Sequence, residues 1–150
     1  MSAIRRWIDG GGTLWIDVAG GGEPAIPSVR ALVRRIMPDG ITRPLGPRDP
    51  IVSGVGLDGG YDCRRVRYRF YALRVIGRLV RPQLEAVLLN KRPAIVYSTM
   101  DLTGGVVGLD HWRIFGYEPK SARRLLANGC LAVLAEQEGK TAGKDAVTAR

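Results

Sequence analysis

The sequence predicts a single α/β domain with a mainly parallel central sheet and helices on both of its faces. Strand-like and helix-like segments alternate along the chain, and the two clearest amphipathic helices begin at Pro27 and at Pro119. The second of them is predicted to run to Ala135 and to bury Leu125, Leu126 and Cys130. The chain has 150 residues, the size of one domain and enough to bury a substantial core. We place the domain at residues 1–138 and predict a flexible tail at 139–150, where the sequence is polar and aperiodic.

The first third of the chain supplies a helix, a strand, a second helix and a long connection. Residues 2–9 have helical spacing, and residues 13–18 carry the β-branched and aromatic side chains of a buried strand. Three consecutive glycines, 20–22, follow, but their spacing is not that of a phosphate-binding loop. Residues 28–37 predict an amphipathic helix, and residues 39–60 predict a surface connection rich in turns.

The next segments predict a basic edge strand and then a short helix. Residues 64–70 alternate arginine with Val66, Tyr68 and Phe70, as a half-buried strand does. The same alternation of basic and aromatic side chains could bind single-stranded nucleic acid, although charge also commonly guards an edge strand. Residues 71–80 switch to helical spacing. Their apolar positions are Ala72, Val75, Ile76, Leu79 and Val80.

Residues 93–105 are the stretch around which we arrange the domain. Two apolar runs, 84–89 and 94–97, are separated by the short polar segment 90–92, which predicts a β-hairpin. Ligands of open α/β sheets bind beyond the carboxyl ends of strands, so the polar residues after the second run mark a candidate site. The alternative is that they only cap turns or the next helix. These residues are Ser98, Thr99, Asp101, Thr103, Gly104 and Gly105.

The candidate site is a polar pocket between two strand ends. Asp17 ends the first strand and Asp101 follows the central one, so parallel strands would bring both carboxylates to one edge of the sheet. Two carboxylates would favour a polyol, a sugar or a cation over an anion, and Trp112 could add a stacking wall. The predicted ligand-binding set is Asp17, Ser98, Asp101, Thr103, Gly104, Gly105 and Trp112.

The sequence gives little support for catalysis or for a bound metal. His111 is the single histidine, and a hydrolase using Asp101 and His111 as acid and base is an alternative function. No nucleophile elbow occurs, and neither cysteine lies at a strand-to-helix turn. We therefore assign no catalytic residue, no metal site and no cofactor. Cys130 lies on an apolar helix face and is predicted to be a core residue.

The balance of charge is strongly basic, with 23 Lys and Arg against 14 Asp and Glu and a net charge of +9. Because the arginines are spread along the chain, we keep nucleic-acid binding only as a second alternative. No run reaches the ~18 apolar residues of a membrane span. Residues 1–12 lack the apolar core of a signal peptide. We expect a cytoplasmic protein by default, with an unidentified small polar ligand.

An ordered set of motifs extends over most of residues 4–135. These motifs are Gly11-Gly12-Thr13-Leu14-Trp15-Ile16-Asp17, Ile95-Val96-Tyr97-Ser98, Asp101-Leu102, Gly104-Gly105, Gly116-Tyr117, Pro119, Ala122 and Asn128. The set resembles one bacterial family, domain of unknown function 4159. This resemblance implies a flavodoxin-like three-layer sandwich of the class I glutamine amidotransferase-like type. It does not imply amidotransferase activity, because the Cys-His-Glu set of true amidotransferases cannot be placed here.

The resemblance also implies that strands precede the first helix, so that this chain is the C-terminal part of a larger, N-terminally truncated domain. The strand at 13–18 would then be an unpaired edge through which two copies could associate. The function that we expect is a non-catalytic ligand-binding or interaction module.

Overall fold

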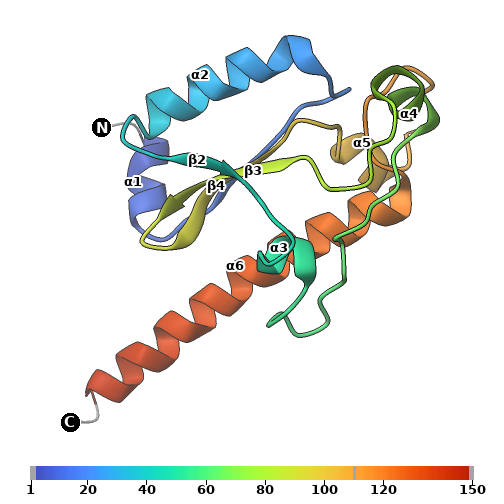
Figure 1. The fold of residues 1–150 in the computed structure, drawn as a ribbon. Helices are drawn as coiled ribbons and strands as arrows, with labels where there is room; N and C mark the ends of the chain where they lie inside the picture. Colours follow the sequence, from blue (N-terminus) through green and yellow to red (C-terminus); the bar gives the residue numbers. More distant parts are fainter. Residues whose placement is uncertain (1–2, 110, 149–150) are drawn as a thin grey trace.

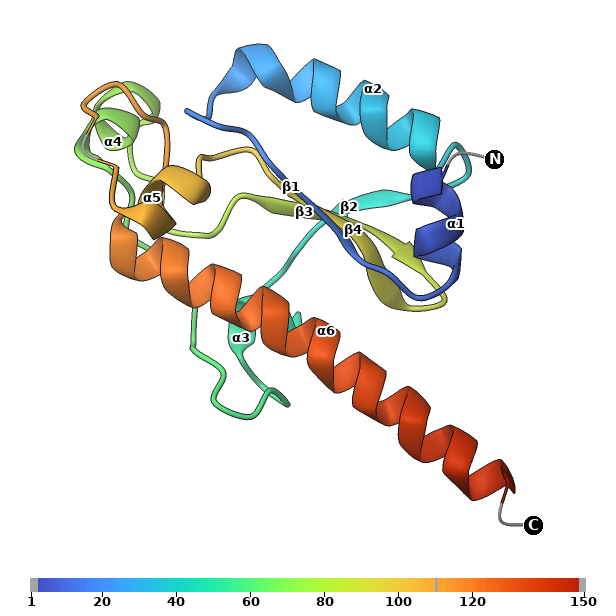
Figure 2. The same ribbon diagram turned by 180° about the vertical axis from the view of Figure 1, so that it is seen from behind.

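The structure is a computed structural model that describes residues 3–109 and 111–148. A four-stranded mixed sheet lies between two layers of helices (Figures 1 and 2). Along the chain the elements are α1 (Ala3–Asp9), β1 (Leu14–Asp17), the 3₁₀ helix η1 (Glu23–Ala25), α2 (Ile26–Ile36), β2 (Thr42–Pro44), α3 (Pro50–Ser53), α4 (Phe70–Ile76), β3 (Leu84–Leu89), β4 (Arg92–Ser98), α5 (Thr103–Val107) and α6 (Pro119–Thr148).

The strands are ordered β1-β4-β3-β2, and only β1 and β4 run parallel. β3 is antiparallel to both β4 and β2, so the predicted mostly parallel sheet is wrong. The cause is the β3–β4 hairpin, whose turn residues Asn90 and Lys91 have φ of 51° and 68°. Such a tight turn makes the central pair antiparallel. The predicted hairpin and the α/β class are both confirmed.

Helices cover both faces of the sheet, and β4 lies between the two cores. α1 and α2 pack on one face, whereas α3, α5 and α6 pack on the other (Figures 1 and 2). Ile95 and Tyr97 belong to the core under α2, and Val96 between them belongs to the core under α6. This period-two alternation, with all three residues at most 1% exposed, shows that β4 is buried on both faces of the sheet.

The long helix α6 begins at Pro119, as predicted, but the side that it packs on the sheet differs from the predicted one. Leu125 is fully buried, whereas Leu126 is only half-buried and Cys130 is exposed. The prediction that Cys130 is a core residue is therefore wrong. The reason is close packing at Gly129, where a Cβ atom would lie 2.4 Å from the ring of Trp15. Small residues let the helix approach the sheet, so the largest apolar side chains do not define its buried face.

Three other segments differ from the sequence predictions. Residues 64–70 form no strand, because only Tyr68 makes an isolated bridge, to Tyr117. The predicted connection at 39–60 contains β2 and α3. Helix α6 continues beyond its predicted end at Ala135 to Thr148, through most of the segment predicted as a tail.

Candidate functional site

Asp17 and Asp101 meet at the N-terminus of α5. The carboxylate of Asp17 accepts hydrogen bonds from the backbone N–H groups of Leu102 (3.0 Å) and Thr103 (2.7 Å). The carboxylate of Asp101 accepts one from the N–H of Gly104 (2.9 Å). Parallel pairing of β1 with β4 brings the two acids to one edge of the sheet, where they satisfy the free N–H groups of a helix start.

Burial changes the pKa of Asp101. Asp101 is only 2% exposed, and this burial raises the pKa of its carboxyl group above the usual value. The N–H of Gly104 opposes the shift, whereas the neighbouring Asp17 carboxylate raises the pKa further. We call this pair the acidic cap: Asp17 is half-buried and Asp101 is buried, and Asp101 holds its proton to a higher pH than an exposed aspartate does.

The glycine pair after Asp101 is required by packing. A Cβ atom at Gly104 would lie 2.2 Å from Oδ2 of Asp101. At Gly105 it would lie 2.6 Å from Cβ of Ala122 in α6. Both glycines are buried, so their lack of a side chain lets the capped helix pack closely against α6.

Two other predicted site residues, Ser98 and Trp112, lie on different loops. The hydroxyl of Ser98 is buried and donates to the carbonyl oxygen of Met100, within the loop that follows β4. Trp112 lies on a different loop, 66% exposed, with its ring against Tyr71. The hydrogen bonds agree with the alternative that Asp17 and Asp101 cap the next helix. Ligand binding by the predicted set stays a prediction.

His111 is exposed, and its Nδ1 accepts a hydrogen bond from the N–H of Arg113 (3.3 Å). Among the described residues, no hydrogen bond or ion pair joins His111 to Asp101. Within the same part of the chain, no group of three or more His, Cys, Asp or Glu side chains could hold a metal ion.

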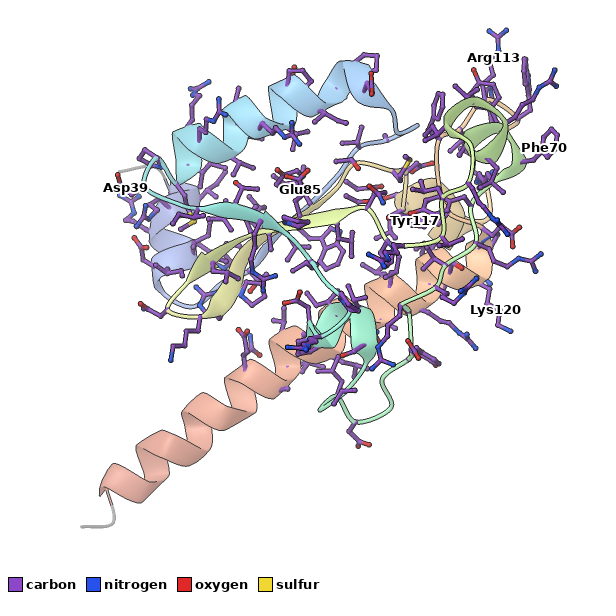
Figure 3. All side chains as sticks on the ribbon, viewed as in Figure 1. Asp39, Phe70, Glu85, Arg113, Tyr117 and Lys120 are labelled. Carbon is purple, nitrogen blue, oxygen red and sulfur yellow. The ribbon has the colours of Figure 1, made fainter. Side chains whose placement is uncertain are left out.

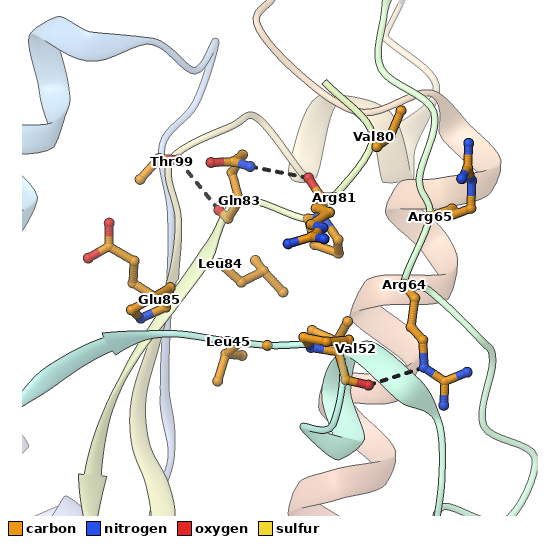
Figure 4. Close-up of a pocket in the computed structure, with 14 residues that line it drawn as sticks. Leu45, Val52, Arg64, Arg65, Val80, Arg81, Gln83, Leu84, Glu85 and Thr99 are labelled. Carbon is orange, nitrogen blue, oxygen red and sulfur yellow. Dashed lines mark hydrogen bonds between the residues drawn. The ribbon is translucent and has the colours of Figure 1, made fainter. Parts of the chain in front are cut away.

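A cavity of about 580 Å³ opens at the sheet edge beyond the carboxyl ends of β2 and β4 (Figure 4). Thr99 directly follows β4, and its N–H donates to the carbonyl oxygen of Gln83, which directly precedes β3 (3.2 Å). Leu84 and Val52 supply apolar lining. The polar and charged side chains that line the cavity are Arg64, Arg65, Arg81, Gln83, Glu85 and Thr99.

The charge in this cavity is positive and mostly uncompensated. Arg64 is held by the carbonyl oxygen of Pro47 and by Asp62, both at 3.1 Å. The exposed guanidinium groups of Arg65 and Arg81 have no hydrogen-bond or ion-pair partner among the described residues. The carboxylate that lines the cavity, Glu85, is engaged elsewhere.

Glu85 accepts hydrogen bonds from the hydroxyl of Tyr97 and from Arg30, the latter at 2.9 Å. Its negative charge is therefore shared with α2 on the other face of the sheet, and it compensates the cavity arginines only weakly.

Sequence reasoning missed these arginines because it assigned residues 64–70 to an edge strand and 71–80 to a helix. The available signal was the position of Arg64-Arg65 and Arg81 on either side of that helix. Helix α4 lies between these arginines in the sequence, and the chain turns back around it, so the segments before and after α4 come together (Figure 1).

The architecture is that of an α/β domain whose mixed sheet carries helices on both faces. The chain belongs to the family described as domain of unknown function (DUF4159), whose model matches residues 1–128. No curated protein and no solved structure matches the chain. The finer relation to the glutamine amidotransferase-like fold stays a prediction. In the described residues, no helix has the length and apolar character needed to cross a membrane.

Proposed function

We propose that this domain is a non-catalytic module that binds a small anionic ligand at the carboxyl edge of its sheet. The observation that carries the proposal is the pair Arg65 and Arg81, two exposed guanidinium groups that line one cavity without an acidic partner among the described residues. Guanidinium groups form paired hydrogen bonds with carboxylates and phosphates, so two of them at one cavity favour an anion with several oxygen atoms.

The shape and composition of the cavity agree with a small ligand. Its volume of about 580 Å³ lies within the range of small-molecule sites, and it opens at the strand ends where α/β domains bind ligands. Gln83 and Thr99 add neutral polar groups beside the apolar Leu84. A sugar or a cation, which the sequence suggested, has less support because the backbone already occupies the carboxylates of Asp17 and Asp101.

Calorimetric titration with pyrophosphate and citrate tests this proposal. The double variant Arg65→Gln/Arg81→Gln should weaken binding of the better anion by roughly tenfold or more, because two charge-assisted contacts are lost. The matched control is Arg34→Gln/Arg35→Gln on α2, where two exposed arginines are removed with the same change in net charge. An equal loss in the control, or tighter binding of glucose or Mg²⁺ than of either anion, would contradict the proposal.

The hydrolase alternative has a test of its own. Turnover of generic ester or amide substrates that disappears in both Asp101→Asn and His111→Ala would favour an enzyme over a binding module. The geometry does not bring Asp101 and His111 together as an acid–base pair, since Asp101 is buried at a helix start and His111 lies exposed on a separate loop.

A further inference from the structure

A second surface, at the end of the molecule that carries α4, combines exposed aromatic rings with arginines. Phe70 is 77% exposed and Trp112 is 66% exposed, and Phe70 and Arg113 project outward there (Figure 3). A cavity of about 520 Å³ lies between α4 and the loop at 111–113. Large exposed rings grouped in this way mark interaction sites. We call this the Trp112 surface; its residues are Arg69, Phe70, Tyr71, Arg74, Trp112 and Arg113.

The Trp112 ring of this surface is held by neighbouring side chains. Trp112 meets Tyr71 edge to face, with ring centroids 5.8 Å apart. Tyr71 in turn packs against Phe115, with centroids 4.8 Å apart. The guanidinium of Arg113 lies 4.3 Å from the centroid of the Trp112 ring. An indole that is held by a perpendicular ring and by a guanidinium, yet stays 66% exposed, offers a platform for another flat ring.

The charge of the surface favours an anion. Arg74 is exposed and has no hydrogen-bond or ion-pair partner among the described residues. Arg69 donates hydrogen bonds to neutral carbonyl oxygens, including that of Gly104 (3.1 Å), and these bonds do not neutralise its positive charge. Glu118, a carboxylate that lines the cavity, pairs with Arg67 at 3.4 Å. The partner should therefore carry both flat rings and negative charges.

We propose that the Trp112 surface binds single-stranded nucleic acid, with bases stacked on Trp112 and Phe70 and phosphates contacting Arg74 and Arg113. A single strand exposes the faces of its bases, whereas a duplex hides them. A lipid headgroup would satisfy the arginines but has no flat ring to stack on Trp112 and Phe70, and the acidic side chains of a peptide have none either. This site lies apart from the cavity lined by Arg65 and Arg81 and adds a second ligand class to the proposed function.

The test measures fluorescence anisotropy of a labelled twelve-nucleotide oligo(U) and oligo(dT) with the full chain. Trp112→Ala and Phe70→Ala should each weaken binding by roughly tenfold, because stacking on an aromatic side chain contributes about that factor per base. Arg74→Gln should lower the slope of log K against log salt by about one, as loss of a phosphate contact does.

Two controls separate this site from general charge and from the other cavity. Tyr61→Ala removes an exposed ring outside the Trp112 surface, and the guanidinium of Arg124 lies 5.3 Å from the centroid of that ring. This variant should leave oligonucleotide binding unchanged. Arg65→Gln/Arg81→Gln should weaken oligonucleotide binding no more than Arg34→Gln/Arg35→Gln does. The two proposals can therefore fail independently.

Four outcomes would overturn the inference. They are no binding at low salt, equal losses in Tyr61→Ala and Trp112→Ala, binding of duplex or heparin as tight as that of the single strand, and binding of anionic vesicles without binding of oligonucleotide. Circular dichroism of each variant confirms that its fold is intact before binding is compared.

Discussion

The acidic residues at the start of α5 and the arginines at the sheet edge occupy comparable places beyond strand ends, yet the fold treats them differently. Asp17 and Asp101 accept backbone N–H groups of Leu102, Thr103 and Gly104. The guanidinium groups of Arg65 and Arg81 have no partner among the described residues. A polar side chain at the carboxyl edge of the sheet therefore does not by itself mark a ligand site. A polar group that remains unsatisfied and accessible is the better indicator.

The largest loss of stability is expected where a buried polar group has all its partners inside the protein. Asn128 is fully buried; its amide donates to the carbonyl oxygens of Ile51 (2.9 Å) and Tyr61 (2.7 Å) and accepts from the N–H of Tyr61 (2.8 Å). Asn128→Asp removes both donors and buries a charge, so the free energy of unfolding should fall by about 3 kcal/mol or more.

Urea denaturation measures this change, and Cys130→Ser on the exposed side of the same helix serves as control, with an expected change within about 0.5 kcal/mol. A loss below about 1 kcal/mol for Asn128→Asp would show that Asn128 does not fasten α6 to the loop after α3.

A smaller loss is expected from crowding behind the acidic cap. Gly105→Ala would place its Cβ atom 2.6 Å from Ala122 and 2.9 Å from the carbonyl oxygen of Tyr117, and should cost about 1–3 kcal/mol of unfolding free energy. Gly46→Ala is the matched control, because its nearest contact would be an ordinary 3.6 Å to Asp49. Equal thermal midpoints for the two variants would mean that α5 can move away from α6 without cost.

The acidic cap itself should respond to pH through Asp101. Its pKa is raised in the folded state, so the stability that its protonated form contributes is fully present below the unfolded pKa near 4 and is lost as pH rises through the folded value. Asp101→Asn imitates the protonated form, since the amide can accept from Gly104 and donate to Asp17. At pH 7 it should leave stability unchanged or raised, whereas Asp17→Asn should lose about 1 kcal/mol.

Denaturation of both variants at pH 4 and pH 7 checks this difference. The advantage of Asp101→Asn should shrink toward pH 4, because the parent carboxyl becomes more protonated as the pH falls. A loss at pH 7 as large as that of Asp17→Asn would mean that the charged form of Asp101 is the one the fold prefers.

The smallest effect on folding is expected at the cavity arginines. Arg65→Gln/Arg81→Gln should change the free energy of unfolding by less than about 0.5 kcal/mol, because neither exposed side chain has a partner to lose among the described residues. Chemical denaturation beside the parent protein measures it. A loss above 1 kcal/mol would indicate that these arginines stabilise the fold, which would weaken the case for a ligand.

The sequence predicted those features that depend on local chemistry. The hairpin around Asn90 follows from two apolar runs with a short polar turn, and the meeting of Asp17 with Asp101 follows once β1 and β4 run parallel. The buried side of α6 could not be predicted, because contact of Gly129 with Trp15 is set by packing between distant segments. The meeting of Arg65 and Arg81 at one cavity could not be predicted either, because Arg65 was assigned to a strand and Arg81 followed a predicted helix.

The position of β1 has a consequence for the timing of synthesis and folding. β3 and β4 are joined by a two-residue turn, and such hairpins form within microseconds once both strands exist. β1 has β4 as its partner in the sheet, and Leu14 pairs with Ile95, so this strand must wait for roughly eighty more residues, on the order of ten seconds at ribosomal speed. During that interval Leu14, Trp15 and Ile16 lack the strand with which the structure pairs them, so this apolar nascent segment is open to non-native contacts.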